Sequence, residues 1–470
     1  MKFSGFMGHI WDMAALPAPE GHGTLEKTKK TAAHTAPRRE EKKMEKQEAE
    51  RKARHWEKRL LAFVHWLLLG AGIGAVIGGG VGSAFYWVLQ QVTALRGDYP
   101  WLLYLLPAAG VLIQGMYRLC GVKESRGTNL VLLAVRSPQQ LPVRMAPLIF
   151  VGTALTHLCG GSAGREGAAL QIGGSLGYSL GRLLHRDEKE RHVLTMCGMG
   201  SVFAALFGTP VAATVFALEV VSVGEMYYPA LVPTVLACVT ASGIAQLLGA
   251  QPTHFDVSGI APVGLLPGLQ VLALSALCAL VAAGFCLALR WVGKGMHKFL
   301  PNPYVRALVG AAIVIVFNLV SGTTDYEGAG TDVIARAVAG EAVPQAFLWK
   351  ILLTALTLGA GFKGGEIVPT FFIGATFGCF AGGLLGLSPG FGAAVGLVAL
   401  FAGVTNCPVS ALLLGCSIFG FEGAPYYLLA AAISYALSGY TGLYSAQKIL
   451  YSKFRPAFID KPLDGSDHTA

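Results

Sequence analysis

The sequence contains little charge for its length. Asp, Glu, Lys and Arg make up only 13% of the 470 residues, whereas hydrophobic residues make up 53%. An ordinary globular protein carries about 25% charged residues. Because so few polar side chains cannot cover so much apolar sequence in water, the composition excludes a set of soluble domains. It predicts an all-α multi-pass membrane protein instead.

Motifs for cofactors and metals are also missing. The nine cysteines are scattered, without a Cys-x-x-Cys pair or a Cys/His cluster at metal-ligand spacing, so we expect neither disulfides nor a zinc site. The chain lacks the Gly-x-x-x-x-Gly-Lys-Ser/Thr motif of nucleotide-binding loops. No clustered nucleophile, base or metal ligand points to a membrane-embedded enzyme. We therefore expect no cofactor, no metal and no enzymatic activity.

The charge that is present is concentrated near the N-terminus. Residues 1–59 hold 14 Lys/Arg and 9 Asp/Glu, which gives +5 of the total net charge of +9. Interleaved glutamates argue against a nucleic-acid-binding arm, and Met1–Pro19 lacks the apolar core of a cleavable signal peptide. We expect residues 1–58 to form a solvated, partly helical tail on the cytoplasmic side, because basic residues before a first span stay there.

Uncharged stretches dominate the remainder of the chain. No charge occurs between Leu60 and Arg96, and the 55 residues of Ile367–Phe421 carry none, enough for about two spans. Several other segments are too short or too rich in Gly and Pro for simple spanning helices. Such backbone is tolerated at membrane depth only where it is buried or lines a polar cavity. The charged segment 182–191 is expected to be a cytoplasmic loop.

Two motifs occur twice at nearly the same spacing. Gly164-Arg-Glu166 matches Gly364-Gly-Glu366 at an offset of 200, and the stretch around Pro210 matches that around Pro408 at an offset of 198. Short, interrupted segments at corresponding positions of two halves point to a transporter's binding site. We therefore expect two structural halves, about 60–250 and 260–450, of the kind that forms inverted repeats.

The first pair of motifs has the chemistry of an anion site. Glycines let the backbone approach an ion closely, and a helix that begins there presents free N–H groups and the positive end of its dipole. A glutamate in that first turn can occupy the anion's place, leave when protonated, and so couple a proton to an anion. The alternative, that Gly-x-Glu is only a helix cap, is weakened for Glu166 and Glu366 by their repetition within long apolar runs.

Other ionisable residues have simpler explanations. Arg165 and Lys363 are each expected to pair with a neighbouring carboxylate or to extend toward the membrane surface. His157 is expected to be a hydrogen-bonded core histidine rather than a proton relay. For Glu219, at the end of an apolar segment, a relay and a helix-end charge remain open.

At these motifs the sequence resembles the CLC family of chloride channels and anion/proton antiporters, over about residues 60–450. The resemblance is carried by the strings GSAGREG (161–167), FGTPVAATVFALE (207–219), KGGEIVP (363–369) and GLYSA (442–446). It implies a fold of two inverted-topology repeats with broken and re-entrant helices, in a transmembrane transport domain over 59–455 followed by a short tail, 456–470. It also implies a homodimer in a bacterial-type plasma membrane, with lipid, halide ions and protons as the partners.

The resemblance carries roles over to individual residues. Glu166 matches the gating glutamate, Tyr444 matches a tyrosine that reaches the central anion, and Glu366 is implicated in proton coupling. The implied anion-binding residues are Ser125, Arg126, Gly127, Arg165, Gly167, Ala168, Ile367, Val368 and Tyr444.

Departures from the family pattern bear on the substrate. Chloride members usually read Gly-Ser-Gly-Ile-Pro where this chain reads Glu-Ser-Arg-Gly-Thr-Asn (124–129), and Ala168 replaces a usual proline. Val220 stands where chloride antiporters carry a second, internal glutamate. That absence and Glu366 are similar to the fluoride-exporting branch, whose first filter segment has a methionine that this chain lacks, whereas Ser125 favours chloride. The sequence predicts fluoride/proton antiport, with a chloride channel or chloride/proton antiporter as the alternative.

Overall fold

The computed structural model describes residues 37–122, 127–137 and 139–463. It divides into two compact units, residues 1–61 and 62–470. Within the first unit, the described residues belong to helix α2 (Pro37–Ile73), which continues into the second unit. Six of the described helices are long and apolar enough to cross a membrane. Shorter apolar helices accompany them, as the Gly- and Pro-rich segments predicted.

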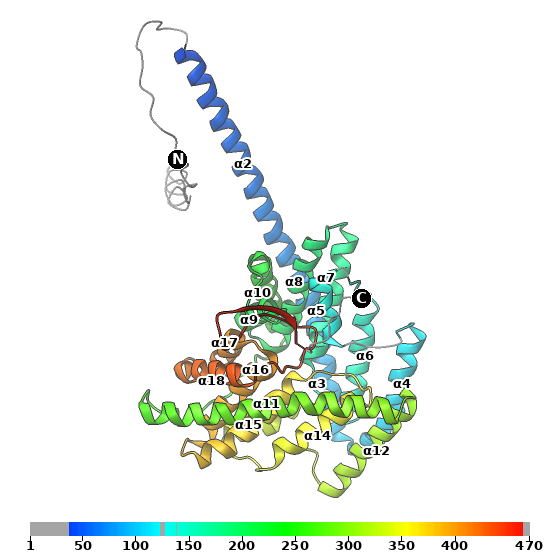
Figure 1. Cartoon of the computed structure of the whole chain (residues 1–470). Helices are drawn as coiled ribbons and strands as arrows, with labels where there is room; N and C mark the ends of the chain where they lie inside the picture. Colours follow the sequence, from blue (N-terminus) through cyan, green and yellow to red (C-terminus); the bar gives the residue numbers. More distant parts are fainter. Residues whose placement is uncertain (1–36, 123–126, 138, 464–470) are drawn as a thin grey trace. The chain divides into compact units, whose positions relative to one another are not determined.

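The helices of the second unit fall into two successive sets (Figure 1). After α2, the first half contains η1 (Gly74–Gly82), α3 (Ser83–Asp98), η2 (Pro100–Leu105), α4 (Leu106–Leu119), α5 (Thr128–Arg136), α6 (Met145–Leu158), α7 (Glu166–Leu183), α8 (Glu188–Phe207), α9 (Pro210–Glu219), η3 (Tyr228–Ala230) and α10 (Leu231–Leu247). The second half contains α11 (Leu265–Phe299), α12 (Pro303–Ser321), α13 (Thr331–Val338), α14 (Ala346–Gly359), α15 (Ile367–Leu384), α16 (Pro389–Thr405), α17 (Pro408–Phe419) and α18 (Ala424–Leu437). In both halves a long helix, α2 or α11, precedes a set of shorter ones.

The second pair of motifs breaks a helix in each half. Helix α8 ends at Gly208 and α16 ends at Asn406, and both residues have left-handed backbone, with φ of 71° and 60°. Glycine and asparagine are the residues that adopt this conformation most readily. Pro210 and Pro408 then start α9 and α17, where a missing N–H costs nothing. The uncharged stretch 367–421 therefore forms three helices, α15, α16 and α17, and not the two spans that its length suggested.

Glycine allows the central helices of each half to touch along their backbones. A Cβ on Gly173 of α7 would lie 2.1 Å from the carbonyl oxygen of Gly198 on α8, and one on Gly374 of α15 would lie 2.6 Å from that of Gly396 on α16. Close approach through small residues is the usual way in which membrane helices associate. It fixes α7 and α15, the two helices that begin at the glutamate motifs, inside the body.

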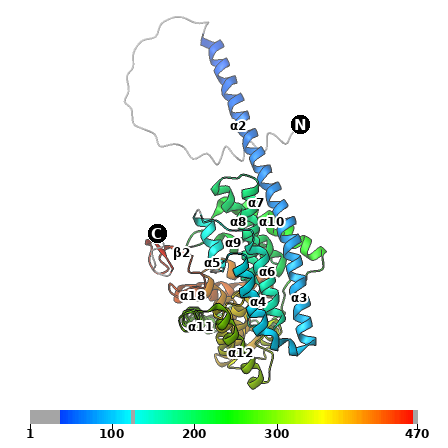
Figure 2. The same cartoon turned by 90° about the vertical axis from the view of Figure 1, so that its right-hand side faces the viewer.

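The C-terminal part of the described chain forms a small sheet with a short strand after α9. Strand β1 (Ser222–Val223) pairs in parallel with β2 (Lys448–Tyr451), and β2 pairs antiparallel with β3 (Phe458–Pro462). Figure 2 shows β2 at the edge of the helical body. Strand β3 lies within residues 456–470, which the sequence analysis expected to be a separate tail. Its pairing with β2 joins this segment to the loop that contains Tyr444.

Glu219 is a helix cap in this structure. Its buried carboxylate accepts hydrogen bonds from the backbone N–H of Val409 at 3.1 Å and of Ser410 at 2.8 Å, and from the Ser410 hydroxyl. These donors lie in the first turn of α17, where a negative charge is favoured by the helix dipole. Of the two alternatives that the sequence left open, the contacts favour the helix-end charge, which joins α9 to α17.

We expect Glu219→Gln to reduce stability without changing what the protein transports. Removing the charge weakens the bonds to Val409 and Ser410, and a hydrogen bond to a charged group contributes about 2 kcal/mol. The free energy of unfolding in detergent, followed by denaturant titration, should fall by roughly this amount. Glu225→Gln, at an exposed acid in the next loop, serves as the control and should shift it by less than about 0.5 kcal/mol. A Glu219→Gln variant with the same free energy of unfolding as the wild type would contradict the capping role of Glu219.

Candidate functional site

The two glutamate motifs meet at a pair of backbone hydrogen bonds. The N–H of Gly164 donates to the carbonyl oxygen of Gly365 at 2.7 Å, and the N–H of Gly365 donates back to Gly164 at 2.7 Å. This antiparallel bridge lies directly before the starts of α7 and α15. It also shows that the chain runs in opposite directions through the two motifs, as inverted repeats require.

Both helix starts present backbone N–H groups that precede the first intrahelical hydrogen bond. The first intrahelical bonds run from Ala169 to Arg165 and from Thr370 to Glu366, each at 3.0 Å. The N–H groups of residues 167 and 168, and of 367 and 368, precede these bonds, and within the described chain no side chain caps either helix at its N-cap. Such donors, together with the positive ends of two helix dipoles, form an anion-binding arrangement without a full positive charge.

Glu166 is completely buried at the start of α7. Its Oε2 accepts a hydrogen bond from the N–H of Arg165 at 3.1 Å, and its Oε1 forms an ion pair with Nε of Arg165 at 3.2 Å. The guanidinium of Arg165 also lies 5.5 Å from the ring centroid of Tyr86. The prediction that Arg165 pairs with a neighbouring carboxylate is therefore confirmed, and the pair holds the Glu166 carboxylate beside its own helix start.

The side chain of Glu366 reaches from α15 toward the start of α7. Its Oε2 is buried, and among the described residues it has no hydrogen-bond partner. A Cβ placed on Gly167 would lie 3.0 Å from this oxygen and 3.4 Å from Oγ1 of Thr128, the first residue of α5. The carboxylate thus lies between three helix starts, those of α5, α7 and α15.

Tyr444 lies in the same region. Its side chain is 1% exposed and its hydroxyl has no hydrogen-bond partner within the part of the chain that is described. Its neighbours in sequence, Leu443 and Ser445, line the same cavity as Glu366. Its loop is held from outside, because Arg290 donates to the carbonyl oxygen of Gly442 at 3.2 Å. A buried hydroxyl without a protein partner is a candidate donor to a bound ion.

The predicted first filter segment is only partly placed. Ser125 and Arg126 lie outside the described residues. Gly127 is the N-cap of α5, with a φ of 58° that suits glycine. The next residue, Thr128, donates from Oγ1 to the carbonyl oxygen of Gly167 at 3.3 Å, which brings the start of α5 to that of α7.

Two further ionisable residues near the glutamate motifs, His157 and Lys363, have structural partners. The ring Nε2 of His157 lies 3.3 Å from the carbonyl oxygen of Gly164, as expected for a core histidine. The Nζ of Lys363 lies 4.4 Å from the ring centroid of Tyr117, and among the described residues it has no ion pair with a carboxylate. The described ranges contain no cluster of three or more His, Cys, Asp or Glu that could hold a metal ion.

Comparison with known proteins identifies the family. The sequence profile of the voltage gated chloride channel family matches residues 109–439. The chain belongs to the voltage gated chloride channel (CLC) family. A relative from Pseudomonas syringae pv. tomato, named chloride/fluoride channel protein, is 35% identical over 395 residues, which are 83% of this chain and 87% of the relative.

Solved structures agree with the family. A crystal structure of a CLC-type fluoride/proton antiporter has a TM-score of 0.78 at 32% identity and covers 82% of this chain and 98% of its own. A slow cyanobacterial Cl⁻/H⁺ antiporter has a TM-score of 0.68 at 19% identity, over 79% and 94% of the two chains, and supports the fold alone. Both confirm the CLC-type fold that the resemblance implied.

Two cavities of this CLC chain approach the glutamates. One, of about 310 Å³, is lined by Arg165, Arg96, His157 and the acids Asp325, Glu327 and Asp332. The other, of about 700 Å³, is lined by Glu366 together with Arg290, Lys294 and His297 of α11. Arg165 of the first glutamate motif thus lines one cavity, and Glu366 of the second motif lines the other. The second cavity is rich in positive side chains, which raise the local concentration of anions.

Sequence reasoning missed Thr128 and the basic residues of α11 in this CLC site. A signal for the latter was present: Arg290, Lys294 and His297 follow the apolar segment 262–289 at intervals of four and three residues, which places them on one helix face. Thr128 gave no signal beyond its position directly after the predicted filter residues.

Proposed function

We propose that the chain exchanges fluoride for protons across the membrane. The observation that carries this proposal is the Glu366 carboxylate, whose Oε2 faces the start of α7 and whose side chain also lines the basic cavity. It lies where it can compete with an anion and exchange protons with water. Val220 is buried at the position of the internal glutamate of chloride antiporters, so Glu366 takes its place as the second proton carrier.

The ion site in this proposal consists of two helix starts, those of α7 and α15, and one hydroxyl. Fluoride is the halide that accepts hydrogen bonds most strongly, and the site offers N–H donors of residues 167, 168, 367 and 368 with the hydroxyl of Tyr444. Glu166 serves as the gate: its carboxylate occupies the helix start when charged and leaves it when protonated. Relatives named as a chloride/fluoride channel protein and as a CLC-type fluoride/proton antiporter support this choice.

The orientation and assembly belong to the same proposal. The protein is a transporter and not an enzyme, works as a homodimer in the plasma membrane, and has a cytoplasmic N-terminus. Support for the orientation comes from Arg186, whose Nη2 lies 2.6 Å from Nε2 of His65. This contact brings the charged segment 182–191 close to His65, a few residues after the basic tail, and so supports a common cytoplasmic side for both under the positive-inside rule.

Proteoliposomes loaded with equal fluoride and chloride test the proposal. Ion electrodes and a pH probe follow both anions and protons from purified wild-type protein. We expect efflux dominated by fluoride, and an imposed pH gradient should drive fluoride uphill. Chloride efflux equal to or above that of fluoride would show that the protein is a chloride transporter. Downhill anion flux without proton movement would show that it is a channel.

Glu366→Gln separates the role of the second carboxylate from that of the gate. We expect this variant to lose proton-driven uptake because its amide cannot carry a proton, with a decrease of at least about a hundredfold. Wild-type uptake in Glu366→Gln would leave Glu366 as a structural residue. Glu225→Gln, at an exposed acid, is the matched control.

A further inference from the structure

Two buried charges lie outside the anion site. Lys350 on α14 is completely buried, and Glu327, in the 322–330 loop between α12 and α13, is 5% exposed. Ionisable groups within a membrane body are costly and usually functional. Neither residue contacts a helix start described above, so their partners must explain their presence.

Lys350 binds the 322–330 loop to helices α14 and α15. Its Nζ donates to the carbonyl oxygens of Tyr326 at 3.1 Å and of Gly328 at 2.7 Å. The same ammonium lies 5.0 Å from the ring centroid of Phe372 on α15. The charge is thus shared by two backbone oxygens and an aromatic face, which holds the loop against α14 and α15.

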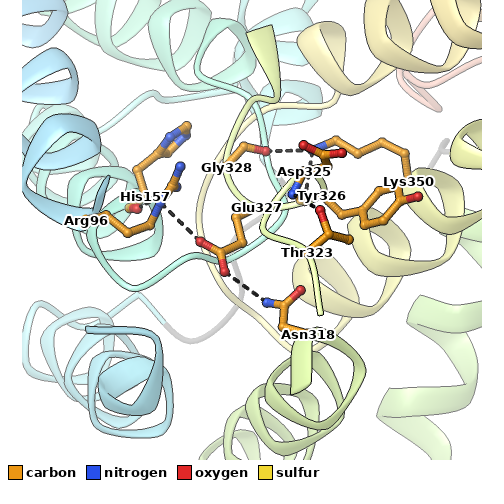
Figure 3. A network of polar contacts seen from close by, with 9 residues as sticks. All are labelled: Arg96, His157, Asn318, Thr323, Asp325, Tyr326, Glu327, Gly328 and Lys350. Carbon is orange, nitrogen blue, oxygen red and sulfur yellow. Dashed lines mark hydrogen bonds and ion pairs between the residues drawn. The ribbon is translucent and has the colours of Figure 1, made fainter. Parts of the chain in front are cut away.

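Glu327 connects this loop to the first half (Figure 3). Its Oε2 forms an ion pair with Nε of Arg96 at 3.2 Å, and its Oε1 accepts a hydrogen bond from Nδ2 of Asn318 at 3.2 Å. Arg96, on α3, also donates from Nη1 to the carbonyl oxygen of His157 at 3.1 Å. One guanidinium therefore joins the loop of the second half to the end of α6.

These contacts converge on the segment that precedes the gate. The N–H of Gly328 donates to the carbonyl oxygen of Gly161 at 3.1 Å. The ring of His157, whose own carbonyl is held by Arg96, approaches the carbonyl oxygen of Gly164. Segment 159–165 is thereby held at two points, Gly161 and Gly164, by residues outside it, immediately before Glu166.

We propose that Lys350, Glu327 and Arg96 form a clamp that holds the start of α7 in place while protons and anions exchange there. This inference rests on the proposed function. Coupled exchange requires Glu166 to leave and return without the helix starts separating, because a looser start would let anions pass without a proton. The three are positioning residues, since they act on the gate only through the backbone of segment 159–165.

Lys350→Met and Glu327→Gln test the clamp by two readouts. The first is the ratio of protons to fluoride transported, which should fall about fivefold in each variant, while a purely structural role would lower both fluxes together. The second is hydrogen–deuterium exchange of a peptide covering 159–165, which should become about tenfold faster. Lys453→Met is the matched control, because this lysine donates to the carbonyl oxygen of Tyr435 at 2.8 Å, outside the clamp. It should change neither readout.

The outcomes separate the clamp from the proposed function. If the wild type moves fluoride without protons, the antiport proposal fails, and the exchange readout still decides whether the clamp holds segment 159–165. If exchange and ratio are both unchanged in Lys350→Met and Glu327→Gln, the clamp is overturned while antiport stands. If Lys350→Met does not fold, Glu327→Gln, which keeps the size of the side chain, decides alone.

Discussion

Glu166→Gln is expected to abolish proton movement while anions continue to cross. The substitution keeps the shape of a side chain that is completely buried at the start of α7, but an amide can neither carry a proton nor compete as a charge with the anion. Proton transfer by a positioned carboxylate contributes about 10²–10⁴-fold, so uphill fluoride movement driven by a pH gradient should fall by at least about a hundredfold. Passive anion flux should persist or increase, because the gate no longer takes up the anion's place.

The measurement is proton and fluoride flux from the same proteoliposomes. The substitution also removes the ion pair with Arg165, which could destabilise the protein. The unfolding midpoint of Glu166→Gln is therefore measured in parallel, to separate lost stability from lost proton transfer. Glu225→Gln should behave as wild type in both assays. Proton pumping that survives in Glu166→Gln would remove Glu166 from the mechanism, and loss of anion and proton flux alike would make it a structural residue.

The sequence predicted where α7 and α15 begin, but not which backbone groups their starts contact. Repetition of Gly-x-Glu and of the Pro210 and Pro408 motifs was enough to predict two halves, since both features are local. The bridge between Gly164 and Gly365 was not predictable, because either glycine alone is compatible with many turns. Only the packing of two halves about 200 residues apart brings these backbones together.

The number of helices was harder to predict than their apolar character. Hydropathy reports how much apolar sequence there is, but a helix ends where the backbone leaves the helical region, as it does at Asn406. The clamp was missed for a related reason. Arg96 and Glu327 are 231 residues apart, and Asp98 is a nearer acid for Arg96 in the sequence, so nothing in the local sequence indicated this pair.

Gly365→Ala should have the second large effect, on anion and proton movement together. A Cβ on Gly365 would lie 2.4 Å from the backbone nitrogen of Gly167 and 3.0 Å from its Cα. No real Cβ tolerates such contact with backbone, which cannot rotate away as a side chain can. The two 2.7 Å hydrogen bonds between Gly164 and Gly365 must lengthen, and the starts of α7 and α15 must move apart.

Separation of the starts of α7 and α15 weakens anion binding at the proposed ion site. The donors of both helices then no longer face one ion, and a misplacement of about 1 Å in such a site can cost about a hundredfold in rate. Fluoride flux per folded protein, normalised by size-exclusion chromatography, measures the effect. Gly243→Ala is the matched control, because a Cβ there meets open space on α10 and alanine favours helix. Normal flux in Gly365→Ala would show that the bridge does not set the site, and that the donors of one helix start suffice to bind the anion.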